Sequence, residues 1–126
     1  MFDDPKEYRK LRKQYNGKMF LSGVETFREF EEMEAHALKD GALSQKHKEL
    51  IALAVSIAQS CYGCIEYHVT QAMERGASRK EVIETAAVAL ALGGGTVQWP
   101  ARYVFRVLEE IESGGGKPEE EKKAKK

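Results

Sequence analysis

Hydrophobic residues recur three or four positions apart along most of this 126-residue chain. No stretch shows the sustained alternation of apolar and polar residues that marks a half-buried β-strand. The breaks in the pattern fall at clusters of Gly, Ser and Asp, which are residue types that end helices and form turns. The pattern therefore predicts an all-α fold, a single-domain bundle of about six helices over residues 1–113.

The amino-terminal half is predicted to hold three helices. The first covers about residues 5–15 and ends at Asn16-Gly17. The second carries an apolar stripe and ends at Asp40-Gly41, a pair that suits a helix C-terminus. Ser44 can cap the third helix, which continues to Ala58.

Three further helices are predicted in the carboxyl-terminal half. Each is bounded by capping or helix-breaking residues: 60–75 between Ser60 and Gly76, 78–92 between Ser78 and Gly93-Gly94-Gly95, and about 100–111 after Pro100. Ser78 followed by Glu81 matches the capping box, in which the two side chains satisfy backbone N–H groups of the first turn. Proline is tolerated in a first turn, where its missing N–H would have had no partner.

Two helical segments, residues 50–58 and 82–92, are apolar on nearly every side. We expect them to be buried almost all round. Six short helices cannot comfortably cover both segments, so association of several copies of the chain is expected. Residues 114–126, by contrast, hold Gly, Pro, Glu and Lys and have nothing to bury. They are predicted to form a disordered charged tail.

Composition limits the classes of partner. The 20 basic and 20 acidic side chains cancel, which leaves no broad field of one sign to bind nucleic acid or an anionic membrane. The longest uncharged run, residues 50–65, contains polar residues and falls short of the ~20 apolar residues of a membrane span. The acidic amino terminus has no apolar stretch behind it, unlike a secretory signal. A soluble, cytoplasmic protein is expected.

The chain's only two cysteines stand close to a histidine in the pattern C-x2-C-x3-H, as Cys61, Cys64 and His68. On a helix these three positions lie within about 60° of one another. If Ser60 is the cap, Cys61 lies in the first turn, where free backbone N–H groups and the helix dipole favour a thiolate. His68 can take up the thiol proton, so the cluster points to thiol chemistry.

The cluster has two other interpretations. The cysteines could be small buried side chains and the histidine an ordinary hydrogen-bonded one, but three such residues on one helix face favour function. A structural zinc site would need a fourth ligand and normally a second paired motif, and neither is evident. A spacing of three also closes too short a loop to act as a stabilising staple. We therefore expect no metal and no cofactor.

Glu49 is the last charged residue before the apolar run that precedes the cysteines. On one unbroken helix it would point about 120° away from Cys61. It can approach the cluster only if the chain bends between Ala58 and Cys61, and Ser60 is the expected place. Spacing alone favours an exposed Glu49.

The stretch from Glu49 to His68 resembles the E-x11-C-x2-C-x3-H signature of the alkylhydroperoxidase D-like proteins, which belong to the carboxymuconolactone decarboxylase superfamily. The likeness extends over about residues 44–95. It implies an all-helical fold, trimers or hexamers, and a Cys61–Cys64 redox pair with Glu49 and His68 as its proton relay. Many members have a histidine just before the second cysteine, whereas this chain has Gly63 there.

Three functional hypotheses follow. The first is a thiol-disulfide oxidoreductase with peroxidase activity. Its substrates would be small hydroperoxides or disulfides, and its electron partner a peroxiredoxin or a dithiol reductant. The second is a cofactor-independent decarboxylase in which His68 and Glu49 do the acid–base work, although that branch of the superfamily generally lacks the cysteine pair. The third is an electron-relay or assembly partner without turnover of its own.

Overall fold

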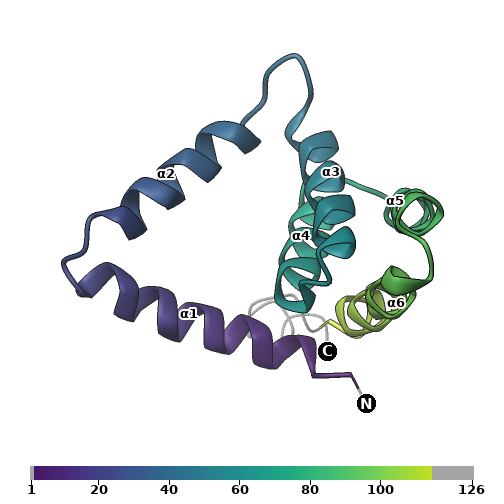
Figure 1. The fold of residues 1–126 in the computed structure, drawn as a ribbon, viewed down its shortest axis with the longest axis horizontal. Helices are drawn as coiled ribbons and strands as arrows, with labels where there is room; N and C mark the ends of the chain where they lie inside the picture. Colours follow the sequence, from purple (N-terminus) through teal and green to yellow (C-terminus); the bar gives the residue numbers. More distant parts are fainter. Residues whose placement is uncertain (1, 115–126) are drawn as a thin grey trace.

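The computed structural model describes residues 2–114, and within them it contains six α-helices, one short 3₁₀ helix and no strand (Figure 1). The elements are α1 (Pro5–Leu21), α2 (Thr26–Leu38), α3 (Gln45–Ala58), α4 (Tyr62–Glu74), α5 (Arg79–Gly93), η1 (Gly95–Val97) and α6 (Gln98–Glu112). The predicted all-α, single-domain fold is confirmed. The predicted tail lies outside the described residues except for Gly114.

Helices α3 to α6 form the body of the molecule. α3 packs against both α4 and α5, and α6 packs across the same two helices. The fully buried apolar side chains come from all four: Leu53, Ile57, Ile65, Val69, Ala72, Val82, Tyr103, Val104, Val107 and Leu108. This core fixes α3 against α4, the two helices that carry the candidate residues.

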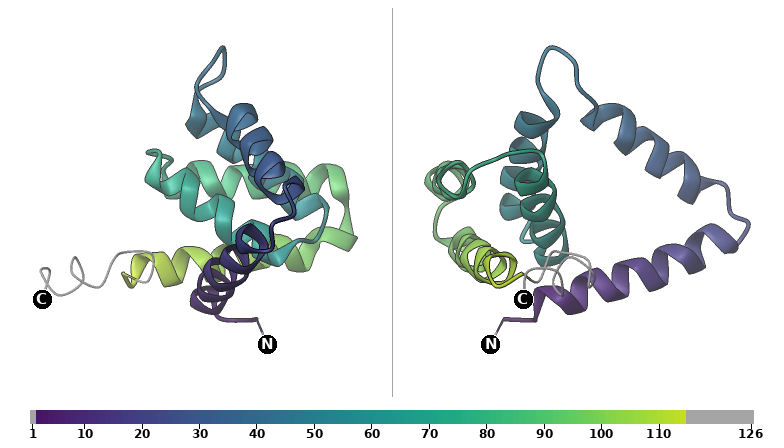
Figure 2. Two further views of the ribbon diagram at one scale, coloured as in Figure 1. Left: turned by 90° about the vertical axis from the view of Figure 1, so that its left-hand side faces the viewer. Right: turned by 180° about the vertical axis from the view of Figure 1, so that it is seen from behind.

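Helices α1 and α2 form a V-shaped arm on one side of this body (Figures 1 and 2). α1 contacts α4 and α6, and α2 returns towards α3 without burying any residue of its own. The predicted end of the first helix at Asn16-Gly17 is wrong, because α1 continues to Leu21. A glycine inside a helix costs only about 1 kcal/mol. The helix ends instead just before Gly23, which takes a left-handed φ of 82°.

The predicted caps of α3 and α5 are confirmed. The Ser44 hydroxyl accepts a hydrogen bond from the His47 N–H at 3.2 Å. Ser78 accepts from the Glu81 N–H at 3.1 Å, while the Glu81 carboxylate accepts from the Ser78 N–H at 2.8 Å, which completes the capping box. These bonds occupy backbone groups that a helix start otherwise leaves without partners.

The expectation that residues 50–58 and 82–92 are buried on nearly all sides is wrong for the single chain. Ile51 and Val55 of α3 are 51% and 49% exposed, and Leu92 of α5 is 86% exposed. Neighbouring helices cover one side of α3 and of α5 and leave the opposite side open. Further large apolar side chains are exposed on α2, where Phe30 and Met33 are 59% and 60% exposed.

Candidate active site

The turn between α3 and α4 determines where the cysteines lie. Ser60 takes a left-handed φ of 53°, and the Cys61 N–H donates to the Ser56 carbonyl at 3.0 Å. The chain therefore bends at Ser60, as predicted. The prediction that Ser60 caps α4 is wrong, because its left-handed backbone belongs to the turn and Cys61 takes the cap position.

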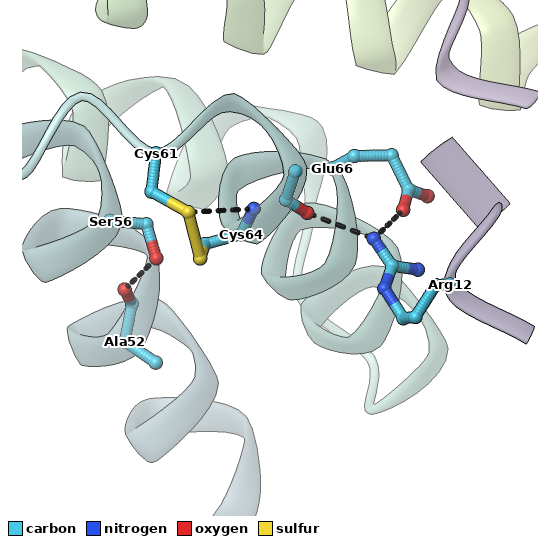
Figure 3. The surroundings of a disulfide bond; sticks show 7 residues. Arg12, Ala52, Ser56, Cys61, Cys64 and Glu66 are labelled. Carbon is cyan, nitrogen blue, oxygen red and sulfur yellow. Dashed lines mark hydrogen bonds and ion pairs between the residues drawn. A yellow bond between two sulfur atoms is a disulfide. The ribbon is translucent and has the colours of Figure 1, made fainter. Parts of the chain in front are cut away.

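Cys61 and Cys64 form a disulfide across the first turn of α4, with their Cα atoms 5.2 Å apart (Figure 3). The Cys61 sulfur also accepts a hydrogen bond from the Cys64 N–H at 3.3 Å, so it caps the helix. Both cysteines are partly exposed. The pair is thus at the positively polarised end of α4, where a thiolate is favoured once the disulfide is reduced.

Glu49 of α3 faces inward and contacts His68 of α4. Its side chain is 3% exposed, and its Oε2 lies 2.7 Å from His68 Nδ1. A carboxylate at this distance accepts the Nδ1–H of the neutral ring, which leaves Nε2 as the nitrogen that can take a further proton. Spacing alone favoured an exposed Glu49. The bend at Ser60 reverses the chain, so that α4 packs along α3 and covers this carboxylate.

A hollow of about 620 Å³ lies next to the disulfide. Cys61, Cys64 and His68 line it from α4, and the α1–α2 arm supplies the opposite wall through mainly aromatic and aliphatic side chains: Leu11, Tyr15, Met19, Phe20, Phe27 and Phe30. The four predicted site residues therefore lie close together. Glu49 contacts His68 from the side away from the hollow, and the two cysteines line the hollow.

Sequence reasoning missed an ionic cluster beneath this turn. Glu66 is fully buried and accepts hydrogen bonds from Arg9 at 2.7 Å and Arg12 at 2.6 Å, both on α1. Thr70 donates to the same carboxylate at 2.9 Å, and Arg9 also pairs with Glu110 of α6. Only the position of Glu66 within the C-x2-C-x3-H segment gave a signal, because the arginines are remote in sequence.

Tyr67 lies beside His68, with the two ring centroids 5.1 Å apart. Burial raises the pKa of Tyr67 above its ordinary value, and the carboxylates of Glu34 and Glu49 raise it further. The phenol therefore keeps its proton to a higher pH than an ordinary tyrosine does. Among residues 2–114, no three His, Cys, Asp or Glu side chains gather in a way that could hold a metal ion, and no helix is long and apolar enough to cross a membrane.

Residues 25–110 match the family model of the carboxymuconolactone decarboxylase family. The chain belongs to this family. The matched region contains all four candidate residues, whereas α1 precedes it. A member of the family from Legionella pneumophila has a similar structure, with a TM-score of 0.82 and 32% identity over 92% of this chain and 100% of that one.

A Thermotoga maritima protein is also similar, with a TM-score of 0.76 and 31% identity over 81% of this chain and 92% of that one. A second structure of the same protein has a TM-score of 0.73 at 27% identity, and a role in antioxidative response has been suggested for it.

Curated relatives match over shorter stretches. Uncharacterized protein 4 in the cox locus of Paracoccus denitrificans is 38% identical over 73 residues, which are 58% of this chain and 66% of that protein. An uncharacterized protein of Cupriavidus necator is 37% identical over 59 residues, 47% of this chain and 52% of that protein. The matches therefore span just under two thirds and about half of these two relatives.

Proposed function

We propose that this protein is a thiol-disulfide oxidoreductase that reduces hydroperoxides with the Cys61–Cys64 pair. The observation that supports this best is the partly exposed disulfide at an apolar hollow, with the Glu49–His68 pair beside it. The role in antioxidative response suggested for the Thermotoga maritima relative agrees with this activity.

In the proposed reaction the reduced protein supplies two electrons. A cysteine thiolate attacks one oxygen of the hydroperoxide, the O–O bond breaks, and the leaving alkoxide takes a proton from His68 to give an alcohol. The attacking sulfur becomes a sulfenic acid. The second cysteine then attacks that sulfur, the S–S bond forms, and water leaves. A dithiol reductant exchanges with the disulfide and restores the dithiol, and the dithiol can instead pass its two electrons to the disulfide of a peroxiredoxin partner.

We assign Cys64 as the attacking sulfur because it is one helical turn from His68. Cys61 would then resolve the sulfenic acid and face the reductant. The electrostatics of the helix end favour the opposite assignment, because Cys61 is the cap itself. Glu49 would hold the imidazole in place and stabilise its protonated form, as a buried carboxylate does when it is paired with histidine.

We further propose that the protein acts in the reducing cytoplasm as a homo-trimer or homo-hexamer. The large apolar side chains that the single chain leaves exposed on α2, α3 and α5 support the association of several copies. Contiguous apolar patches on a soluble protein commonly mark association surfaces.

Steady-state reduction of an organic hydroperoxide with dithiothreitol as electron donor tests the proposed function. Cys64→Ser should lose turnover because it removes the attacking sulfur, and trapping of sulfenic acid should label Cys64 in the Cys61→Ser variant. Full turnover in the double Ser variant would remove the thiol mechanism. Decarboxylation of carboxymuconolactone by that double variant would favour the alternative, because the Glu49–His68 pair can do acid–base work without sulfur.

A further inference from the structure

Arg12 of α1 reaches three residues of the segment between Cys61 and His68. Its Nη2 donates to the Gly63 carbonyl at 2.9 Å and to Glu66 Oε1 at 2.6 Å (Figure 3). Its guanidinium carbon lies 4.9 Å from the centroid of the Tyr67 ring. A single side chain that stands 51 positions before Gly63 thus contacts the cysteine turn and the helix that continues from it.

The contact with Gly63 involves the backbone between the two cysteines. The Cys64 N–H that follows Gly63 donates to the Cys61 sulfur, so the orientation of these peptides and the approach of the sulfurs are linked. α1 also lies directly against this glycine, because a Cβ atom there would come within 3.4 Å of the Tyr8 ring. The cysteine turn is therefore held from outside by α1.

Arg12 itself is held by the buried carboxylate of Glu66. That carboxylate also accepts from Arg9 and Thr70, and its side chain is fully buried. A planar guanidinium with several fixed partners keeps one orientation, whereas a flexible point charge does not. The donor that faces the Gly63 carbonyl is consequently pre-positioned.

We propose that Arg12 is a positioning residue that keeps the turn from Cys61 to Cys64 in the geometry that closes the disulfide, and so sets the equilibrium between its disulfide and dithiol forms. This rests on the proposed function only in requiring that the pair can cycle. Without Arg12 the two sulfurs reach bonding distance less often, so the disulfide becomes easier to reduce.

The experiment equilibrates the full-length protein with mixtures of reduced and oxidised dithiothreitol and counts free thiols by alkylation and mass spectrometry. In this exchange two electrons and two protons pass from dithiothreitol to the protein disulfide, and dithiothreitol closes its own S–S bond. We expect Arg12→Gln to shift the equilibrium about tenfold towards the dithiol, the size expected for one lost charge-assisted hydrogen bond. That shift is ~30 mV for a two-electron couple.

Arg9→Gln is the matched control, because it removes the other arginine on the same carboxylate. It should move the equilibrium by less than about twofold, and Arg12→Lys, which keeps a charged donor, should return it towards the wild type. An unchanged equilibrium in Arg12→Gln would overturn the proposal. An equal shift in Arg9→Gln would also overturn it, since loosening of α1 would then explain the effect.

If circular dichroism shows that Arg12→Gln does not fold, Arg12→Lys decides the question. An equilibrium constant for reduction of the disulfide that is higher than that of the wild type, by up to about tenfold, supports the proposal. An equilibrium constant equal to that of the wild type contradicts it. The equilibrium is measured without peroxide. A protein that shows these shifts but reduces no hydroperoxide would refute the peroxidase function and leave the role of Arg12 standing.

Discussion

Replacing Glu49 by Gln removes one negative charge beside His68 and leaves the size of the side chain almost unchanged. The Glu49 Oε2 lies 2.7 Å from His68 Nδ1, and the residue is 2% exposed, so water cannot take the place of the lost charge. A hydrogen bond that involves a charged group contributes about 1.5–3 kcal/mol, compared with about 0.5–1.5 kcal/mol for a neutral one.

The charged and the neutral hydrogen bond differ by about 1–2 kcal/mol when His68 carries a second proton. This difference corresponds to a rate of peroxide reduction that is about five to thirty times lower in Glu49→Gln. His68→Gln removes the proton carrier itself and should lower the rate about a hundredfold or more. The assay is single-turnover oxidation of the reduced protein by cumene hydroperoxide, quenched by alkylation and followed by mass spectrometry.

Glu74→Gln, at an exposed carboxylate of α4, is the matched control and should react at the wild-type rate. Circular dichroism should show equal helix content in all three variants. Wild-type rates in both Glu49→Gln and His68→Gln would refute the relay, and so would an equal loss of rate in Glu74→Gln.

Three further predictions concern the fold. Ser78→Ala breaks the capping box of α5 and should lower the free energy of unfolding by about 1 kcal/mol in urea titrations, an expectation that an unchanged midpoint would contradict. Burial, together with Tyr8 and Glu66, raises the pKa of Tyr103 above its ordinary value. The raised pKa of Tyr103 stabilises the folded state fully below the unfolded pKa of about 10, and this stabilisation declines as the pH rises further. Tyr103→Phe should therefore lose less stability at alkaline pH than the wild type does. Light scattering at micromolar concentration should show an assembly, and a stable 14.2 kDa species would refute it.

Local signals in the sequence accounted for much of the fold. Ser44 and the Ser78–Glu81 pair were identified as caps because the partners of a capping side chain are within three residues of it. The helix end predicted at Asn16-Gly17 is wrong, because the turn preference of this pair is small and the helical hydrogen bonds continue on both sides of it.

The candidate site depended on contacts that no local pattern reveals. Glu49 is 19 positions from His68, and only the bend at Ser60 decides that it faces inward. The contacts of Glu66 with Arg9 and Arg12 span 57 and 54 positions, and they depend on how α1 crosses α4. Ile51 and Val55 were expected to be buried because the helix is apolar all round, but which side its neighbours cover is set by packing.

In the proposed function, Cys61 and Cys64 give their two electrons to a hydroperoxide. The most direct measurement mixes fully reduced protein with one equivalent of cumene hydroperoxide, without any other reductant, and counts both the free thiols and the alcohol formed. We expect that each chain loses two thiols, gains the Cys61–Cys64 disulfide and yields one molecule of alcohol. Two thiols that remain free to alkylation, with the hydroperoxide unconsumed, would contradict it.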